Sequence, residues 1–185
     1  MQAVCEPLVR PSSFTLGHRL GRAMWGVVYI FLFRPTPRIL NGWRIFLLRS
    51  FGARLERGAV VHPSARIWAP WNLSMGEGAC LGPYVDCYAC AEITLGPWSV
   101  VSQYSFLCGA THDYTSLRLP LVTRAIGIGK HAWVCADVFI GPGVSIGEGS
   151  VIGARSSVYR DVPPWSVFAG NPARRVRSRE IRESP

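Results

Sequence analysis

The stretch that decides the fold is residues 128–158, which read IGKHAWVCADVFIGPGVSIGEGSVIGARSSV. An aliphatic residue returns at every sixth position, a period that fits neither an amphipathic helix nor an alternating strand. Glycine follows most of these residues, and small residues such as Val144, Ser150 and Ser156 stand four places after them. This is the pattern of a hexapeptide repeat. The aliphatic positions are Ile128, Val134, Ile140, Ile146, Ile152 and Val158.

A hexad predicts one flat side of a triangular coil. The aliphatic residue points inward and stacks on its equivalents in neighbouring coils, while the small residues permit a tight corner. Three hexads then complete one turn of a parallel β-helix. A doubly wound α/β sheet is disfavoured, because helices cannot fit between strands that are so close together in the sequence.

The same pattern continues upstream in three shorter registers. They are Val61, Ile67 and Leu73; Met75, Leu81 and Cys87; and Leu95, Val101 and Leu107. We therefore expect about five coils from residue 58 to residue 163, with irregular joints near residues 74 and 93. The chain is predicted to comprise an N-terminal helical segment (1–57), the β-helix (58–163) and a C-terminal basic tail (164–185).

One interruption is longer than the joints and spans residues 109–127. Insertions in a solenoid are extruded onto one face, where they often form the binding site. This insertion carries His112 and Asp113, the one adjacent His-Asp pair in the sequence, together with Thr111, Tyr114 and Arg118. We interpret the extruded loop as the best candidate for a functional site.

The net charge is +9, although charged residues make up only 17% of the chain. Arginines gather before residue 58 and again after residue 173. Such clusters attract phosphates, acidic lipid surfaces or nucleic acid, and a solvated tail explains them equally well. The sequence contains no recognisable nucleic-acid-binding module, so no nucleic-acid partner is predicted.

Most of the six cysteines sit at repeat positions that require only a small apolar side chain. Buried free thiols, typical of a cytoplasmic protein, are therefore expected rather than disulfides. Cys87 and Cys90 lack a second pair and a nearby histidine, so no metal site is predicted. The cysteines are Cys5, Cys80, Cys87, Cys90, Cys108 and Cys135.

The N-terminal segment contains an apolar run over residues 24–33 that is too short to span a bilayer. No cleavable signal peptide is predicted, because Pro7 and Pro11 precede the run. Pro35 and Pro37 should end this first helix, and a second is expected over residues 39–51. The pair either covers the open end of the β-helix or makes peripheral membrane contact through residues 14–51.

Six segments of the sequence carry a family resemblance, and they are residues 33–35, 41–44, 67–73, 111–114, 162–165 and 169–173. They resemble hexapeptide-repeat O-acetyltransferases of colanic acid (exopolysaccharide) biosynthesis, and the resemblance covers nearly the whole chain. The chain is more distantly similar to maltose, galactoside and nodulation-factor acetyltransferases. The resemblance implies a left-handed β-helix and a cytoplasmic, acetyl-CoA-dependent O-acetyltransferase that acts on a saccharide hydroxyl.

The chemistry of this reaction agrees with what the loop offers. An alcohol is a weak nucleophile, so a base must remove its proton, and histidine exchanges protons near neutral pH. We predict that His112 is this base and that no covalent acyl-enzyme forms. Asp113 or a backbone carbonyl would orient the imidazole. The resemblance suggests the backbone N–H of Ala136 as donor to the oxyanion.

The resemblance also implies a homotrimer in which each site lies between two subunits. In relatives, acetyl-CoA lies in a groove between neighbouring β-helices, with its phosphates near the last coils. Matching positions nominate Trp133, Ala136, Ala154, Arg174 and Arg177 for the cofactor. The acceptor pocket is predicted from Tyr84, Asp86, Tyr88, Gln103 and Tyr114.

Proteins of this fold also have other functions. A zinc carbonic anhydrase needs three histidines on neighbouring coils, and His112 has no histidine a few residues along. A non-catalytic repeat scaffold stays open, as do acceptors such as a simple sugar, an antibiotic or serine. The aromatic and proline signatures of the resemblance favour a saccharide.

Overall fold

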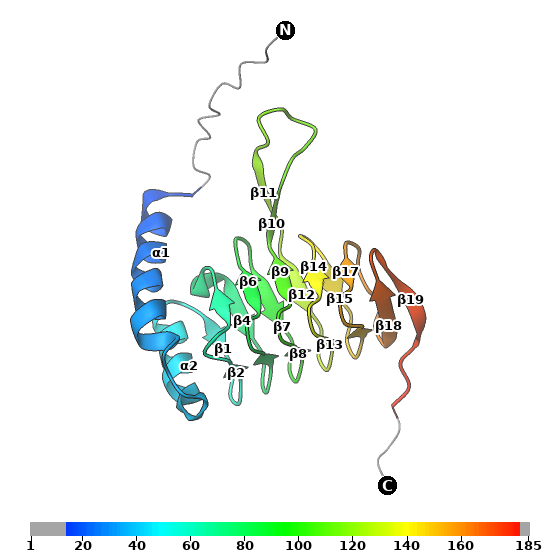
Figure 1. Cartoon of the computed structure of the whole chain (residues 1–185), viewed down its shortest axis with the longest axis horizontal. Coiled ribbons are helices and arrows are strands. Elements are labelled where there is room, and N and C mark those ends of the chain that lie inside the picture. The colour runs from blue at the N-terminus through cyan, green and yellow to red at the C-terminus, as the bar shows by residue number, and fades with distance from the viewer. Residues whose placement is uncertain (1–13, 182–185) are drawn as a thin grey trace.

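The computed structural model describes residues 14–181 and shows a left-handed parallel β-helix of about six turns. Predictions that rest on Cys5, Pro7 and Pro11 lie outside these residues. Two helices cover the N-terminal end of the β-helix, a two-stranded hairpin projects from its middle, and the last strands close the far end (Figure 1).

Three parallel sheets form the sides of the triangular coil, as the hexads predict. Sheet A contains β1 (Arg54–Leu55), β4 (Leu73–Met75), β7 (Ile93–Leu95), β12 (Ile126–Ile128) and β15 (Ser145–Ile146). Sheet B contains β2 (Val60–Val61), β5 (Cys80–Leu81), β8 (Val100–Val101), β13 (Trp133–Val134), β16 (Val151–Ile152), β18 (Ser166–Gly170) and β19 (Ala173–Ser178). Sheet C contains β3 (Arg66–Ile67), β6 (Asp86–Tyr88), β9 (Phe106–Cys108), β14 (Phe139–Ile140) and β17 (Ser157–Val158).

The aliphatic residues of the repeat stack in register inside the coil. Ile128 pairs with Ile146 in sheet A, Val134 with Ile152 in sheet B, and Ile140 with Val158 in sheet C. Each of the six is at most 2% exposed. Burial of one such side chain contributes about 1.5–3 kcal/mol, so the ladder is the main source of stability. The hexad prediction is confirmed.

The irregular joints have a simple cause. Strands β4, β7 and β12 have three residues each, and both end residues of each strand are buried. Such a strand turns two side chains inward, two positions apart, because successive side chains alternate between faces. Sheet A therefore adds two residues to the repeat, and this explains the offset between the upstream registers.

The coil extends beyond the boundaries expected from the sequence. Its first strand begins at Arg54, and residues expected in a C-terminal tail form β18 and β19. Strand β18 pairs in parallel with β16, and the chain then reverses through a cis Asn171–Pro172 peptide so that β19 returns antiparallel to β18. The repeat period alone could not reveal this hairpin, because it has no hexad.

The N-terminal helices are α1 (Leu16–Val28), continued by a π-helical turn η1 (Tyr29–Phe33), and α2 (Asn41–Ser50), preceded by a 3-10 turn η2 (Arg38–Leu40). The indole N–H of Trp25 donates to the Ile67 carbonyl at 2.7 Å. The Asn41 side chain donates to the Ala59 carbonyl and accepts from the Val61 N–H. The helices therefore complete the hydrogen bonding of the first coil. Among residues 14–181, no helix has the length and apolarity needed to cross a bilayer.

Close approach of consecutive coils makes some glycines irreplaceable. A Cβ at Gly147 would lie 2.4 Å from the Pro164 nitrogen, and that atom is backbone that cannot swing aside. We expect Gly147→Ala to lower the free energy of unfolding by about 2 kcal/mol, because overpacking must push two coils apart. Denaturation by urea, followed by tryptophan fluorescence, measures the change.

The matched control for this substitution is Gly26→Ala in α1, where an added Cβ meets nothing within 4 Å. Alanine is a better helix former than glycine, so this change should raise stability by about 0.5 kcal/mol. Equal stability of the two variants would contradict the close approach of the coils at Gly147.

Candidate active site

The extruded loop is an antiparallel hairpin that leaves the coil at the corner between sheets C and A. Strand β10 (Ala110–His112) pairs with β11 (Leu121–Thr123), and His112 lies opposite Leu121. At its base the Gly109 N–H donates to the Tyr88 carbonyl, and the Arg124 N–H donates to the Gly109 carbonyl, both at 3.0 Å. The hairpin is therefore joined to the neighbouring coil and projects from a fixed base (Figure 1). His112 is the last residue of its first strand.

The imidazole of His112 is exposed and held at one nitrogen only. Nδ1 lies 2.7 Å from the carbonyl oxygen of Leu119. A carbonyl can only accept, so Nδ1 carries the hydrogen and Nε2 has a free lone pair. The ring thus has the tautomer that a general base needs, with its basic nitrogen directed away from the hairpin contact.

Asp113 does not bond to His112. Its carboxylate accepts hydrogen bonds from the Thr115 N–H at 2.9 Å and the Thr115 hydroxyl at 2.6 Å, and these bonds lower the pKa of Asp113. The sequence left open whether Asp113 or a backbone carbonyl orients the imidazole. The hydrogen bond between His112 and the Leu119 carbonyl favours the backbone carbonyl. Asp113 instead stabilises the turn at the tip of the hairpin.

A second feature lies at the corner between sheets B and C. Gln103, Ala136 and Ala154 occupy equivalent corner positions in three successive coils and line one hollow of about 460 Å³. Within residues 14–181, the Ala136 N–H has no hydrogen-bond acceptor, whereas its neighbour Asp137 donates to the Gln103 carbonyl. The corner therefore offers a backbone donor to a ligand in this hollow.

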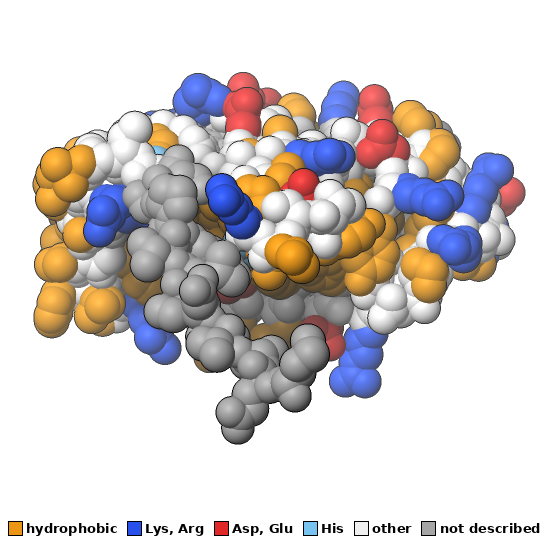
Figure 2. All heavy atoms as spheres, turned by 90° about the horizontal axis from the view of Figure 1, so that it is seen from above, with side chains coloured by type: hydrophobic (Ala, Val, Ile, Leu, Met, Phe, Trp, Pro, Cys, Tyr) orange, Lys and Arg blue, Asp and Glu red, His pale blue; other side chains and the backbone are white. Residues whose placement is uncertain are grey.

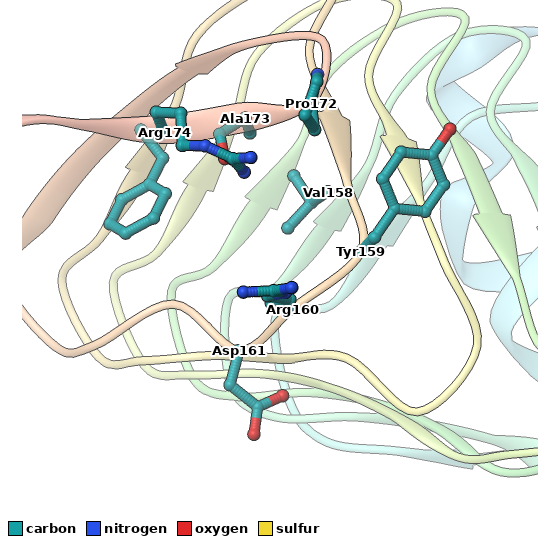
Figure 3. Close-up of a pocket in the computed structure, with 8 residues that line it drawn as sticks. Val158, Tyr159, Arg160, Asp161, Pro172, Ala173 and Arg174 are labelled. Atoms are coloured by element: carbon teal, nitrogen blue, oxygen red, sulfur yellow. The ribbon is translucent and has the colours of Figure 1, made fainter.

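A third hollow, which we call the arginine hollow, has a volume of about 420 Å³. It lies at the C-terminal end, where β17 has no following strand in sheet C. Arg160 and Arg174 both extend into it, with Tyr159 and Pro172 at its edge (Figure 3). Residues 170–172 form the turn from β18 to β19 within sheet B, and the Gly170 N–H donates to the Ser156 hydroxyl at the corner between sheets B and C of the preceding coil. The arginine hollow therefore lies further along the same corner as Ala136 and Ala154.

The remaining residues nominated for the cofactor lie elsewhere. Trp133 is about half exposed on the outer face of sheet B, where its indole N–H donates to the Ser102 hydroxyl at 2.9 Å. It lines a separate hollow of about 480 Å³ with Trp98 and Trp165. Arg177 is exposed on β19 and does not line the arginine hollow.

The residues nominated for the acceptor are spread over sheet C and the hairpin. Tyr84 stacks on Tyr104 at 5.1 Å beside the Ala136 hollow. Asp86 forms an ion pair with Arg66 at 3.7 Å, and burial raises the pKa of this carboxyl. A hydrogen bond with the Cys90 thiol, together with burial, raises the pKa of Tyr88 to about 12. Tyr114, 88% exposed, lies beyond His112 on the hairpin.

A single chain does not bring the two halves of the expected site together. The His112 hairpin follows β9 at the corner between sheets C and A, whereas Ala136 lies between β13 and β14, at the corner between sheets B and C. These corners are the opposite long edges of sheet C. A base and an oxyanion donor at these two positions can meet only across an interface with another chain.

The thiols and the acidic groups form no metal centre in residues 14–181. The described cysteines are free, and burial raises the pKa of each thiol. We expect iodoacetamide to alkylate these five thiols at pH 7 much more slowly in the native protein than in urea, because the thiolate is the reactive form. Peptide mass spectrometry measures each site, and equal rates in both states would contradict their burial.

Sequence reasoning missed some residues of these hollows. Arg160 lies in the arginine hollow, and Asp137 and Arg155 line the Ala136 hollow as an ion pair at 3.5 Å. The sequence did contain a signal for Asp137 and Arg155, because each directly follows one of the nominated alanines, Ala136 and Ala154. No sequence signal pointed to the Leu119 carbonyl, because its contact with His112 depends on the register of the hairpin.

No family model matches this chain, but individual proteins do. It is 42% identical over 169 residues, 91% of this chain and 93% of the other, to the provisionally named colanic acid biosynthesis acetyltransferase WcaF of Escherichia coli (strain K12). Maltose O-acetyltransferase from Clostridium difficile 630 is 25% identical, with a TM-score of 0.80 and 90% of each chain covered. A galactoside acetyltransferase in complex with coenzyme A is 25% identical, with a TM-score of 0.77, covering 90% of this chain and 84% of that chain. The chain therefore belongs to the family of the colanic acid biosynthesis acetyltransferase WcaF, and is a hexapeptide-repeat acetyltransferase.

Proposed function

We propose that this protein is an acetyl-CoA-dependent O-acetyltransferase that acts on a hydroxyl of a saccharide in colanic-acid-like exopolysaccharide biosynthesis. The observation that carries the proposal is the His112 imidazole, which is exposed on a projecting hairpin with Nδ1 bound to the Leu119 carbonyl. The similarity to WcaF over nearly the whole chain supports the choice of a saccharide acceptor. Acetyl-CoA is the second substrate, as the coenzyme A complex of the galactoside acetyltransferase suggests.

In the proposed reaction, His112 Nε2 removes the proton from the acceptor hydroxyl as the oxygen attacks the thioester carbonyl carbon. The carbon–oxygen bond forms, the carbon–sulfur bond breaks, and His112 returns the proton to the departing thiolate. The products are a saccharide acetyl ester and the free thiol of coenzyme A. The hydrogen bond to Leu119 keeps the same ring nitrogen available for both proton transfers.

The Ala136 N–H is the proposed donor to the developing oxyanion. It has no acceptor among residues 14–181, and Ala136 lines a hollow at the corner between sheets B and C. Because His112 lies at the opposite edge of sheet C, the donor must come from a neighbouring subunit. A closed ring of identical chains satisfies this for every site at once, and we propose the homotrimer.

Acetyl-CoA is proposed to lie along the corner from Ala136 past Ala154 toward the arginine hollow. The thioester would then lie at the Ala136 N–H, and the phosphates would lie against Arg160 and Arg174. Charge-assisted hydrogen bonds of arginine suit phosphate oxygens. The corner carries small side chains at Ala136 and Ala154, and these leave room for an extended arm.

Removal of one phosphate contact gives a testable prediction. We expect Arg174→Gln to raise KM for acetyl-CoA about tenfold and to change kcat little, because the contact is present before and during the chemical step. Arg57→Gln, a surface change outside these hollows, is the charge-matched control. If both variants raised KM equally, the loss of general positive charge, and not a phosphate site at Arg174, would explain the effect.

The acceptor is proposed to lie between the hairpin and the aromatic outer face of sheet C, where Tyr88 contacts both Trp68 and Phe106. Aromatic rings of this kind pack against sugar rings. We propose that the enzyme works in the cytoplasm, with residues 14–51 available for peripheral contact with the inner face of the membrane. This location gives it access to acetyl-CoA and to saccharides under assembly.

The experiment that tests this function is thiol release from acetyl-CoA in the presence of a panel of free sugars, nucleotide sugars and lipid-linked saccharides. Release that depends on a saccharide supports the proposal. Release that depends on an antibiotic or serine instead would identify another acceptor class. Coenzyme A binding without release for any acceptor would favour a non-catalytic repeat protein.

A further inference from the structure

The N-terminal helices present a large apolar face to solvent. Leu16, Leu20, Met24, Val27 and Phe31 recur at spacings of three and four, so they fall on one side of α1 and its continuation η1. They are between 57% and 70% exposed. Figure 2 shows hydrophobic side chains gathered at the end of the molecule where these helices lie. An apolar face of this extent marks a site of interaction.

The second helix extends the same face. Ile39 is 88% exposed, and the rings of Trp43 and Phe46 are exposed and stacked at 5.5 Å. The Trp43 indole N–H donates to the Leu32 carbonyl at 3.0 Å, and this bond joins α2 to η1. We call the exposed apolar residues of α1, η1, η2 and α2 the outer helical face. They are Leu16, Leu20, Met24, Val27, Ile30, Phe31, Leu32, Ile39, Leu40, Trp43 and Phe46.

The opposite side of these helices already has its packing partner. Trp25, Phe33 and Leu48 are at most 3% exposed and belong to the core of the β-helix. The hydrogen bonds of Trp25 and Asn41 fix the helices to the first coil. Reorientation of the helices therefore cannot bury the outer helical face within the same chain.

The charge around this face has one sign. Residues 14–55 contain seven arginines and no aspartate or glutamate. Arg44 is buried and Arg54 pairs with Glu92, which leaves exposed arginines such as Arg19, Arg34 and Arg38 near the apolar residues. An apolar stripe with basic flanks and an interfacial tryptophan is the pattern of a helix that lies in the plane of an anionic membrane.

We infer that the outer helical face binds an anionic phospholipid surface, with the apolar side chains of α1 among the lipids and the arginines at the headgroups. The inference rests on the proposed function, which includes peripheral contact with a membrane. It adds which surface of the protein makes this contact and which lipid charge that surface requires. It does not depend on the reaction. Vesicle binding can therefore be absent while acetyl transfer persists, and acetyl transfer can be absent while vesicle binding persists.

The test is flotation of the full chain with vesicles of phosphatidylglycerol and phosphatidylcholine in equal parts, and with vesicles of phosphatidylcholine alone. We expect binding to the anionic vesicles that weakens as salt rises, because basic residues near a charged surface are screened. Arg19→Gln with Arg34→Gln should weaken this binding about 25-fold, at roughly fivefold for each arginine, and should not change binding to the neutral vesicles.

The decisive comparison uses two double variants with the same change in polarity and charge. Met24→Glu with Phe31→Glu should weaken anionic vesicle binding about a hundredfold. Leu117→Glu with Val176→Glu alters side chains that are 96% and 63% exposed and lie on the hairpin and on β19, outside the N-terminal helices. This variant should weaken binding only by the effect of the added negative charge. Circular dichroism confirms that both variants fold.

Three outcomes would overturn the inference. The first is a wild-type chain that fails to float with either vesicle, and the second is equal binding of the anionic vesicles by the two double variants. In the third outcome, Met24→Glu with Phe31→Glu would lower the mass of the assembly in analytical ultracentrifugation and leave vesicle binding intact. That result would show that a second copy of the chain covers the outer helical face.

Discussion

Replacement of His112 with alanine is expected to lower kcat for acetyl transfer by about 10²–10⁴-fold, the usual contribution of a general base. The imidazole is the one group on the hairpin with a free basic nitrogen and a fixed tautomer, set by its 2.7 Å contact with the Leu119 carbonyl. Acetyl-CoA affinity should be unchanged, because the proposed cofactor contacts lie at another corner of the coil. Steady-state kinetics and calorimetric titration of coenzyme A measure the two quantities separately.

The matched control is Asp113→Ala, one residue away on the same hairpin. Its carboxylate bonds to Thr115 and not to the imidazole, so we expect a loss of less than about tenfold. If the two variants lost activity equally, Asp113 would be part of the catalytic pair and the Leu119 carbonyl would not suffice to orient the ring. If His112→Ala kept full activity, His112 would have no role in proton transfer.

Replacement of Arg44 with leucine is expected to lower the free energy of unfolding by about 3 kcal/mol. The guanidinium is 1% exposed and donates to the carbonyls of Val61, Pro37 and Arg38 and to the Thr36 hydroxyl, at 2.8–3.0 Å. Leucine leaves these four acceptors without their donor, and buried unpaired polar groups are costly. The side chain joins α2, the segment before it and the first coil.

Arg57→Leu is the control for this prediction, since Arg57 is exposed and should change stability by less than about 0.5 kcal/mol. Urea denaturation of both variants at one protein concentration makes the comparison. A loss of similar size in the two variants would mean that the charge of arginine stabilises the chain generally. It would contradict a specific contribution from the buried hydrogen bonds of Arg44.

The repeat was predictable from the sequence because its signal is local and periodic. Every inward position from Ile128 to Val158 could be read from the spacing alone, and the structure places each of them in the core. Ala136 and Ala154, which the resemblance nominated, each stand two places after an inward residue of the repeat, and in the structure both line one hollow. Periodic patterns of this kind determine geometry without long-range information.

The features that the sequence did not determine depend on contacts between distant residues. The spacing of His112 and Leu119 gives no sign that their side chain and carbonyl meet, because this depends on the pairing of β10 with β11. Burial of Arg44 could not be foreseen either, since its acceptors come from two segments that are separate in the sequence, residues 36–38 and Val61. The role of Asp113 stayed open in the sequence for the same reason.

The central claim is acetyl transfer to a saccharide hydroxyl with His112 as the base. The most direct test is to incubate the wild type and His112→Ala with isotopically labelled acetyl-CoA and the saccharide acceptor found in the panel, and to measure the labelled ester on the sugar. The account predicts an alkali-labile O-acetyl ester with the wild type. With the variant, the amount of this ester should be lower by a factor of about 10² or more. Equal ester formation by both proteins, or label on an amine in place of a hydroxyl, would contradict it.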